Sequence, residues 1–289
     1  TVGRILANEL LHYSPKKVII LSNNENELFQ MRLEYKGSSH FHFIFCDILD
    51  FQKLNFLFSD VDIVLHLAAL KHVVGCEIDP LEAVKTNIIG IQNIIHAAIE
   101  KKVKRVLFTS SDKAVNPTNV MGTSKLMGER LISAANAKNS KTIFASTRFG
   151  NVLGSNGSVV EIFKKQLLNK EKLTITDDRM TRFVMSVDEA ISLVLESVFL
   201  AKGGEVFITK MPVLKITDLA LALTDLLKNT YDYDPLLVEH KNIGLKPGEK
   251  LYEELMSEEE RLEVVEYATG SMARPVVRSR AGVRSGCAT

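Results

Sequence analysis

One stretch of the sequence places a hydroxyl, a carboxyl and two amino groups close together, and all of these groups can exchange protons. Ser111, Asp112 and Lys113 are consecutive, and Lys125 follows in a segment of helical character. Helical spacing puts Lys125 one turn from Met121 on the same face. Taken alone, Asp112 and Lys113 also fit an ion pair that caps a loop, and Lys125 fits a solvated surface residue. Their chemistry therefore depends on the elements that position them.

The surrounding sequence follows an α/β pattern, because short β-branched runs alternate with longer amphipathic stretches. Strands are expected at residues 18–21, 41–45, 63–67, 105–109 and 142–146, and helices at residues 1–12, 25–35, 51–58, 80–101, 119–138, 159–168, 187–200 and 216–229. A doubly wound fold begins with a strand, whereas this sequence begins with a helix. We therefore expect the first strand and its Gly-rich turn to be absent from this chain, with Gly3 as a remnant of the turn or a simple terminal residue.

The sequence predicts an α/β protein with a Rossmann-like, doubly wound parallel sheet and a smaller C-terminal α/β substrate-binding cap. Residues 1–148 form the NAD(P)-binding part of this prediction. Residues 149–256 are mainly the cap, because polar loops rich in Gly, Asn and Asp replace the earlier pattern after Arg148. Residues 257–289 are expected to be a tail that is disordered or not native to the protein.

Composition excludes several other classes. The 289 residues carry 36 Lys and Arg against 35 Asp and Glu, so no basic surface for nucleic acid or an acidic membrane is expected. No apolar run is long enough for a membrane span and no signal segment is recognisable, which predicts a cytoplasmic protein. The three cysteines form no Cys-x-x-Cys pair and no histidine has metal-ligand spacing, so no metal is expected and His66 is predicted to lie in the core.

Residues at the ends of the expected strands predict cofactor contacts. Asp47 and Ile48 close one strand, with the acid placed to meet an adenine amino group. Leu67, Ala68 and Ala69 close the next strand, where the small side chains let backbone approach a cofactor. Residues 22–24 contain neither the acid that selects NAD nor the arginine that selects NADP, so this choice stays open.

The stretch from Thr109 to Lys125 resembles the extended short-chain dehydrogenase/reductase superfamily, in which a hydroxyl residue at a strand end precedes a Tyr-x-x-x-Lys helix. Within that superfamily, the chain is similar to the nucleotide-sugar 4,6-dehydratases that act on UDP-N-acetylglucosamine. The similarity runs from Gly3 to about Met256. Its motifs are Ala68–Val73, Pro80–Asn87, Ser111–Pro117, Arg148–Val152, Asp178–Phe183 and Lys246–Leu251.

The resemblance implies a three-step reaction. The family oxidises the sugar C4 hydroxyl by hydride transfer to bound NAD(P)+, eliminates water across C5 and C6, and returns the hydride to C6. It implies that Ser111 hydrogen-bonds the C4 oxygen, that Asp112 is the acid for the C6 hydroxyl, and that Lys113 is the base for the C5 proton. Oxidation acidifies that proton, so a modest base suffices. An acid at neutral pH needs a raised pKa and a basic lysine a lowered one.

Met121 stands where the superfamily usually has tyrosine, and a thioether cannot accept a proton. A subset of the family is similar in having Ser-Met-Lys in place of Ser-Tyr-Lys. The C4 proton would then go to Asp112, or to a water relayed through Lys125. The resemblance also implies that Lys125 reaches the nicotinamide ribose of NAD or NADP.

Further residues are assigned to the ligands by the same resemblance. Lys71 and Asn87 belong to the cofactor side, although Asn87 fits equally well as a structural bridge between helix and strand. Lys71, Asn151, Arg182 and Glu249 are the expected contacts of the UDP-sugar substrate. Arg182 would clamp its diphosphate, although it also fits a surface arginine beside Asp178.

Three functions remain possible from the sequence. A dehydratase for surface glycan precursors is favoured, because Asp112 and Lys113 have no use in a 4-epimerase, which needs only reversible C4 oxidation. A non-catalytic sensor of NAD(P) or nucleotide sugars is the alternative from another class. The motifs favour retention at C5 slightly over inversion. A homo-oligomer is expected, with the helices at 80–101 and 119–138 as a candidate interface.

Overall fold

The computed structural model describes residues 1–138, 141–231, 233, 235, 238–267 and 276–280. A six-stranded sheet has the order β12-β13-β9-β5-β4-β3. Strands β3, β4, β5 and β9 are parallel, and a separate parallel pair is formed by β1 and β2. The bounds are β1 Val18–Ser22, β2 Phe41–Phe45, β3 Ile63–His66, β4 Arg105–Ser111, β5 Ile143–Phe149 and β9 Glu205–Thr209. This confirms the predicted α/β class.

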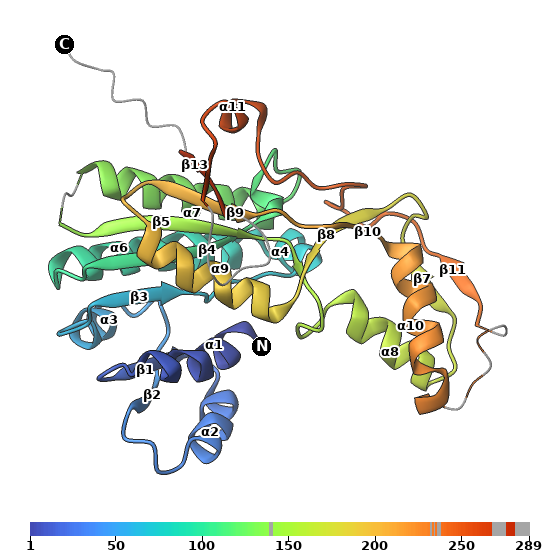
Figure 1. The fold of residues 1–289 in the computed structure, drawn as a ribbon, viewed down its shortest axis with the longest axis horizontal. Coiled ribbons are helices and arrows are strands. Elements are labelled where there is room, and N and C mark those ends of the chain that lie inside the picture. The colour runs from blue at the N-terminus through green and yellow to red at the C-terminus, as the bar shows by residue number, and fades with distance from the viewer. Residues whose placement is uncertain (139–140, 232, 234, 236–237, 268–275, 281–289) are drawn as a thin grey trace.

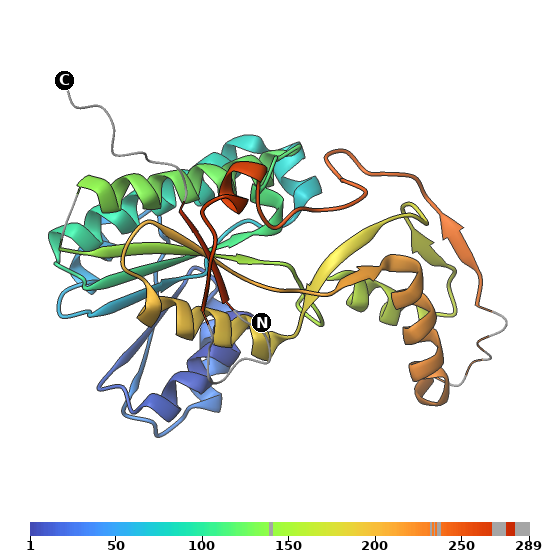
Figure 2. The ribbon, with the colours of Figure 1, turned by 45° about the horizontal axis from the view of Figure 1, so that its top comes forward.

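Helices cover both faces of the sheet (Figure 2). Both faces of β4 are apolar, because neighbouring residues of a strand point to opposite sides. Val106 and Phe108 pack with α3, α6 and α7 in one core, whereas Leu107 packs with α1 and α9 in another. The helices are α1 Val2–Leu10, α2 Glu25–Glu34, α3 Phe51–Leu57, α6 Gly90–Glu100, α7 Val120–Lys138 and α9 Val187–Leu200. The doubly wound arrangement is therefore built around two buried apolar layers.

One long helix of the sequence prediction differs in the structure. Residues 80–101 form α5 (Pro80–Val84), a π-helical turn (Lys85–Ile89) and α6 rather than one regular α-helix. A short helix, α4 (Val73–Ile78), precedes them and was not predicted. Asp79 caps α5, since its carboxylate accepts a hydrogen bond from the backbone N–H of Glu82. A π turn is typical of functional sites.

The cap lies at one end of the sheet, on the right of Figure 1. It contains the three-stranded sheet β10-β8-β6, the parallel pair β11-β7, and two helices around a separate apolar core. The bounds are β6 Asn151–Val152, β7 Leu173–Ile175, β8 Thr181–Met185, β10 Val213–Lys215, β11 His240–Asn242, α8 Val159–Leu168 and α10 Ile216–Tyr231. Within the range 149–256, α9 and β9 return to the main sheet. The division of the chain at residue 148 stays a prediction.

The expectation of a disordered tail is wrong for the described part of residues 257–289, whereas the expectation that these residues are not native to the protein stays a prediction. Residues 258–261 form α11 (Glu258–Arg261), followed by β12 (Val265–Tyr267) and β13 (Val276–Arg280). Strand β13 pairs antiparallel with β9 along five residues and extends the main sheet. Backbone hydrogen bonds to a sheet edge are the physical reason, since they do not require an apolar sequence pattern. Residues 268–275 and 281–289 lie outside the described residues.

A buried ion cluster ties α11 to the sheet. Arg148 on β5 donates to both carboxylate oxygens of Glu129 on α7, at 2.8 and 2.7 Å. It also donates to both oxygens of Glu260, at 2.7 and 2.8 Å. Burial alone would raise the pKa of Glu260, but the hydrogen bonds from Arg148 hold that pKa below its ordinary value. Arg148 thereby links three elements that are far apart in the sequence.

We predict that Glu260→Gln lowers the free energy of unfolding by about 2–3 kcal/mol, because it leaves the Arg148 guanidinium with one carboxylate instead of two. Urea denaturation at pH 7 measures the loss. The stability that Glu260 contributes is present above the ordinary glutamate pKa of 4.5 and is lost as pH falls through its lowered value. The exposed neighbour variant Glu259→Gln is the control. Equal stability of the two variants would contradict the prediction.

Candidate active site

The predicted acid, base and hydroxyl meet at the carboxyl end of β4, where ligands bind in open α/β sheets. The Ser111 hydroxyl donates to Asp112 Oδ1 at 2.8 Å. The Lys113 ammonium donates to the same oxygen at 2.9 Å and to Asn151 Oδ1 at 3.2 Å. Asp112 is fully buried, so this arrangement is more than a surface ion pair that caps a loop. Four residues predicted from the sequence are thus brought together.

Glu253 is a further member of this cluster that the sequence did not predict. Its Oε1 lies 3.7 Å from Lys113 Nζ, and its side chain is almost completely buried. Burial is the main cause that raises the pKa of Glu253, and the Asp112 charge adds to it. Glu253 follows the Lys-Pro-Gly-Glu-Lys-Leu motif closely, but no local pattern relates it to Lys113. Asp112 Oδ2 and Glu253 Oε2 are both buried without a hydrogen-bond partner among the described residues.

Helix α7 places Lys125 beneath the site and leaves position 121 apolar. Lys125 is buried, donates to the backbone carbonyl of Thr109 at 2.9 Å, and lies 4.8 Å from the ring centre of Phe108. Desolvation lowers the pKa of Lys125 to about 8. The alternative of a solvated surface lysine is therefore wrong. Met121 is buried against Cys76 and provides no proton acceptor.

Gly122 permits the close approach of α7 to the turn that carries Asp112 and Lys113. A Cβ atom at this position would lie 2.2 Å from the carbonyl oxygen of Lys113. The Asn119 side chain caps the helix beside it, accepting a hydrogen bond from the Gly122 N–H at 2.7 Å. The sequence therefore needs glycine here for steric reasons, not for backbone flexibility.

Asn87 acts as the structural bridge, the second of the two roles considered for it. It lies in the π turn, and its side chain accepts from the Leu70 N–H and donates to the Leu70 carbonyl. It also donates to Ser124 Oγ on α7 at 2.9 Å. Asn87 thereby fixes the loop after β3 relative to the active-site helix. Its cofactor contact stays a prediction.

The remaining residues of the cofactor side lie at strand ends, as expected. Asp47 follows β2 and accepts hydrogen bonds from Asn23 after β1 and from the Leu49 N–H. The residues Leu67, Ala68, Ala69 and Lys71 follow β3, and Lys71 Nζ donates to the Asn156 carbonyl at 2.5 Å. Burial lowers the pKa of Lys71.

Two further predicted cofactor residues, Ile48 and Gly3, differ in what surrounds them. Ile48 packs against Gly90, where an added Cβ would lie 2.4 Å from its side chain. Gly3 lies in α1 with open space around the position of a Cβ. Cofactor contacts of both residues stay predictions.

Residues 246–254, which we call the strap, run from the cap back to α11 across the loop that follows Lys113 (Figure 2). Lys250 donates to the carbonyls of Val115 and Asn116, and Asn119 donates to the Gly248 carbonyl. Glu254 accepts from the side chain of the same Asn116 at 2.8 Å. The strap therefore holds Glu253 against the cluster.

Arg182 and Glu249 also support the strap. Arg182 is buried and donates to the carbonyls of Thr181 and Leu251, at 2.7 and 3.2 Å, so it is not a surface arginine. Glu249 accepts from the Lys246 N–H and closes a turn. Their substrate contacts stay predictions.

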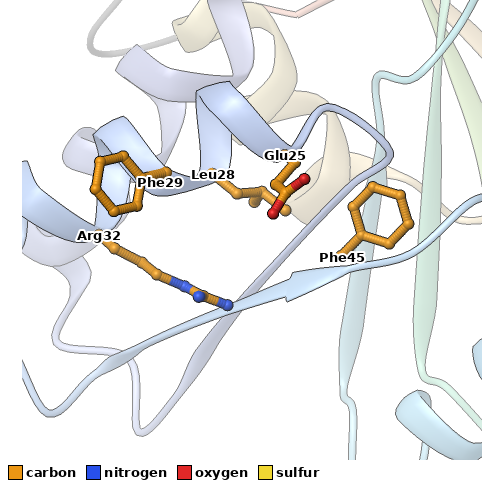
Figure 3. A pocket seen from close by; sticks show the side chains of 5 residues that line it. All are labelled: Glu25, Leu28, Phe29, Arg32 and Phe45. Atoms are coloured by element: carbon orange, nitrogen blue, oxygen red, sulfur yellow. The ribbon is translucent and has the colours of Figure 1, made fainter.

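A pocket of 280 Å³ lies elsewhere, between α2 and β2 (Figure 3). Its lining residues are Glu25, Leu28, Phe29, Arg32 and Phe45. None of the predicted site residues contributes to it, so it is separate from the candidate site.

In the described part of the chain, no group of three or more His, Cys, Asp or Glu side chains is placed to hold a metal ion. His66 is buried and stacks on Phe108, as predicted for a core histidine, but its Nε2 has no hydrogen-bond partner there. Burial lowers the pKa of His66 to about 3, so the ring is neutral. Cys46 and Cys76 are free, buried thiols, whereas Cys287 lies outside the described residues. Among the described helices, none has the length and apolar character to cross a membrane.

The fold and the site together define the class of protein. A parallel sheet with helices on both faces, a serine at the end of its strand and a buried lysine on the next helix are the features of the extended short-chain dehydrogenase/reductase superfamily. The family model described as polysaccharide biosynthesis protein matches residues 1–275. The chain belongs to this family.

Individual relatives are similar over most of the chain. A UDP-N-acetylglucosamine 4,6-dehydratase (inverting) of Campylobacter jejuni is 43% identical, over 89% of this chain and 75% of that protein. An uncharacterized membrane protein of Methanocaldococcus jannaschii is 46% identical, over 90% and 78%. A UDP-glucose 4-epimerase of Rickettsia bellii is 38% identical, over 90% and 74%. The solved structure of Pen from Bacillus thuringiensis is 40% identical, with a TM-score of 0.91 over 97% of this chain and 85% of that one.

We predict that Gly122→Ala destabilises the protein by about 1–3 kcal/mol, because the new methyl group forces α7 away from the Lys113 carbonyl. Thermal unfolding followed by circular dichroism measures this. Gly75→Ala on α4 is the control, since its Cβ would meet its nearest atom at an ordinary 3.8 Å. If both variants melted with the parent, the close approach would not be needed.

Proposed function

We propose that the protein is a nucleotide-sugar 4,6-dehydratase that converts UDP-N-acetylglucosamine into a UDP-4-keto-6-deoxy-N-acetylhexosamine. The observation that carries the proposal is the buried cluster in which Ser111 and Lys113 both donate to Asp112 Oδ1. The names of the Campylobacter relatives support this substrate, and the family description supports a product used in surface glycan synthesis.

NAD or NADP is the proposed cofactor, and it would supply the hydride acceptor and donor. Residues present in the structure fit such a group, because Lys125 offers a buried ammonium with donors to spare beside the strand ends. Asp47, Ala68 and Ala69 would lie along it, with Lys125 at the nicotinamide ribose. The Asn23 side chain is bound to Asp47. Residues 22–24 include neither the acid that would select NAD nor the arginine that would select NADP, so both stay possible.

Asp112 is proposed as the group that receives the C4 hydroxyl proton. Met121 has no group that accepts a proton, and Lys125 as an ammonium has no free lone pair to accept one. Ser111 Oγ is 2.8 Å from Asp112 Oδ1 and can pass a proton from the sugar to this carboxylate. Of the two routes left open by the sequence, to Asp112 or to a water relayed through Lys125, the hydrogen bond between Ser111 and Asp112 supports the one to Asp112.

Elimination of water then uses Asp112 as the acid and Lys113 as the base. Asp112, now protonated, gives its proton to the departing C6 hydroxyl, and Lys113 removes the proton from C5. Because Asp112 is fully buried, bulk water does not compete for the proton it carries. The C4 proton is thus reused as the proton that leaves with water.

At C5 we propose inversion. The sequence favours retention slightly, but two relatives that are 43% identical are named as inverting enzymes. For the substrate, Asn151 is supported by its hydrogen bond to Lys113. Lys71, Arg182 and Glu249 remain the proposed contacts of the nucleotide sugar, with Arg182 at the diphosphate.

A 4-epimerase is the second candidate, favoured by the names of the Rickettsia relatives. An epimerase needs a base for the C4 hydroxyl but no second acid and base, so the buried Asp112–Lys113 pair would have no task. A non-catalytic sensor is the third candidate, and such a protein would bind the ligands without turnover. We favour the dehydratase because its chemistry, unlike that of an epimerase, uses both Asp112 and Lys113.

A homo-oligomer is proposed from exposed apolar side chains that gather on α4 and α5. These are Val74, Ile78, Leu81 and Val84, with exposures of 40 to 80%. Apolar side chains grouped in this way are typical of protein interfaces. The cytoplasm remains the proposed compartment.

The proposed reaction is tested by proton NMR of UDP-N-acetylglucosamine incubated with the enzyme and its cofactor in D2O. We expect a new C6 methyl signal with deuterium at C5, and the couplings around C5 will distinguish inversion from retention. Interconversion with the C4 epimer would instead establish the epimerase, and binding without change the sensor.

Two variants test the assigned roles. Asp112→Asn should slow elimination by at least about a hundredfold, the lower range for loss of a general acid. Lys113→Ala should stop exchange of the C5 proton while leaving cofactor binding intact. Parental exchange in Lys113→Ala would remove Lys113 as the base.

The pH dependence of cofactor binding tests Lys125. Its lowered pKa of about 8 means that the ammonium loses its charge as pH rises through this value. We therefore expect cofactor affinity to fall about tenfold between pH 7 and 9.5, since hydrogen bonds from charged donors are stronger than those from neutral ones. Protein fluorescence titration measures the Kd. Lys125→Met should bind weakly at every pH, and a flat profile in the parent would exclude this role.

A further inference from the structure

Glu253 is a buried charged group at the active site that the reaction described above leaves without a task. It is 7% exposed, and its Oε1 faces Lys113 Nζ at 3.7 Å. Its other oxygen has no hydrogen-bond partner among the described residues. A buried carboxylate that is only partly satisfied is costly, so a function at this position needs to be considered.

The proton balance of the proposed reaction lacks one acceptor. Lys113 forms ion pairs with Asp112 and Glu253 and therefore starts as an ammonium. An ammonium cannot remove the C5 proton until it has lost one of its own. Asp112 cannot take that proton, because it must receive the one from the C4 hydroxyl. A third group next to Lys113 is required.

We propose that Glu253 takes the ammonium proton of Lys113 and so frees this amine to act as the base at C5. The proposal rests on the dehydratase function. Its first step breaks one N–H bond of Lys113 Nζ and forms an O–H bond on Glu253. In this scheme Glu253 acts through Lys113 and is a positioning residue that also holds a proton.

The remaining steps balance. The C5–H bond breaks as Nζ gains the proton, and the electron pair left on C5 forms the C5–C6 double bond. The C6–O bond breaks while Asp112 gives its proton to the departing hydroxyl, which leaves as water. The three side chains then hold one proton more than at the start, which equals the proton that C5 regains at the end of the turnover.

The surroundings of Glu253 make its carboxylate a better proton acceptor than an ordinary glutamate. Burial raises the pKa of its carboxyl most, and the Asp112 carboxylate raises it further. The positive charges of Lys113, Arg182 and Lys250 oppose this shift without cancelling it. The net direction suits a group that accepts a proton from a neighbouring lysine inside the site.

The strap fixes Glu253 on both sides. Leu251 accepts from Arg182 and from the Thr181 N–H, and Lys250 donates to the carbonyls after the 112–114 turn. Glu254 is anchored by Asn116. Because the residues flanking Glu253 are held by the cap and by the sheet, its carboxylate is positioned before substrate binds.

The experiment compares Glu253→Gln with Glu259→Gln, which removes the same charge from an exposed residue of α11. With UDP-N-acetylglucosamine and cofactor, the absorbance of reduced nicotinamide reports C4 oxidation, and NMR in D2O reports exchange at C5. We expect Glu253→Gln to keep the amplitude of C4 oxidation and a UDP Kd within about threefold of the parent. Exchange at C5 should slow by at least about a hundredfold. Glu259→Gln should exchange at the parental rate, and parental exchange in Glu253→Gln would overturn the proposal.

Thermal stability separates this role from a structural one. A carboxyl whose pKa is raised by folding weakens the fold as pH rises from its unfolded pKa through its folded pKa. The ionised carboxylate at pH 8 is therefore unfavourable, and Glu253→Gln should melt at the parental temperature or higher. A lower melting temperature, with C4 oxidation and C5 exchange reduced together, would show that Glu253 only holds the site in shape.

Rescue of Glu253→Ala provides a second test. Formate can occupy the space and accept a proton, whereas formamide has nearly the same shape and cannot. We expect formate alone to restore C5 exchange, and rescue by both or by neither would contradict proton transfer. A parent that forms no 4-keto-6-deoxy product would instead refute the dehydratase function itself.

Discussion

A carboxylate that water cannot reach must be surrounded by hydrogen-bond donors and positive charge, and Asp112 meets this condition through Ser111 and Lys113. Those two donors are its sequence neighbours, but the partners of Lys113 are not. Asn151 comes from β6 and Glu253 from the strap. The buried charge on Asp112 is therefore stabilised only when three parts of the chain are folded together: the main sheet, the start of the cap and the strap. The positions of these elements follow from this constraint.

The second buried ion cluster, around Arg148, explains how the returning chain is held. Arg148 lies on β5, next to the strand that carries Ser111, and its guanidinium binds the backbone carbonyl of Leu255 as well as Glu260. Leu255 follows Glu253 by two residues. Arg148 thus fixes the chain just after the strap, while Glu253 within the strap faces Lys113. The stability of α11 and the geometry of the active site are therefore coupled.

The elements that the sequence predicted well are those with a strong local signal. The boundaries of α8 and α9 match the expected helices because their apolar spacing and the Ser186 capping box are local features. The cluster of Ser111, Asp112 and Lys113 was found because its members are consecutive. Glu253 was missed because its contact with Lys113 depends on a chain path through the whole cap. Strand β13 was missed for a related reason, since its pairing with β9 uses backbone atoms that every residue has.

The thioether of Met121 is the reason that the proposed reaction needs a further proton acceptor. A tyrosine at this position would take the C4 proton itself. Asp112 would then be free to accept the ammonium proton of Lys113. In the proposed reaction, the thioether in its place leaves Asp112 with two roles, first as acceptor of the C4 proton and then as proton donor at C6. Lys113 must then lose its proton to another partner, and Glu253 is the carboxylate that faces it on its remaining side. The loss of one proton-accepting side chain on α7 is thereby matched by a carboxylate from the strap.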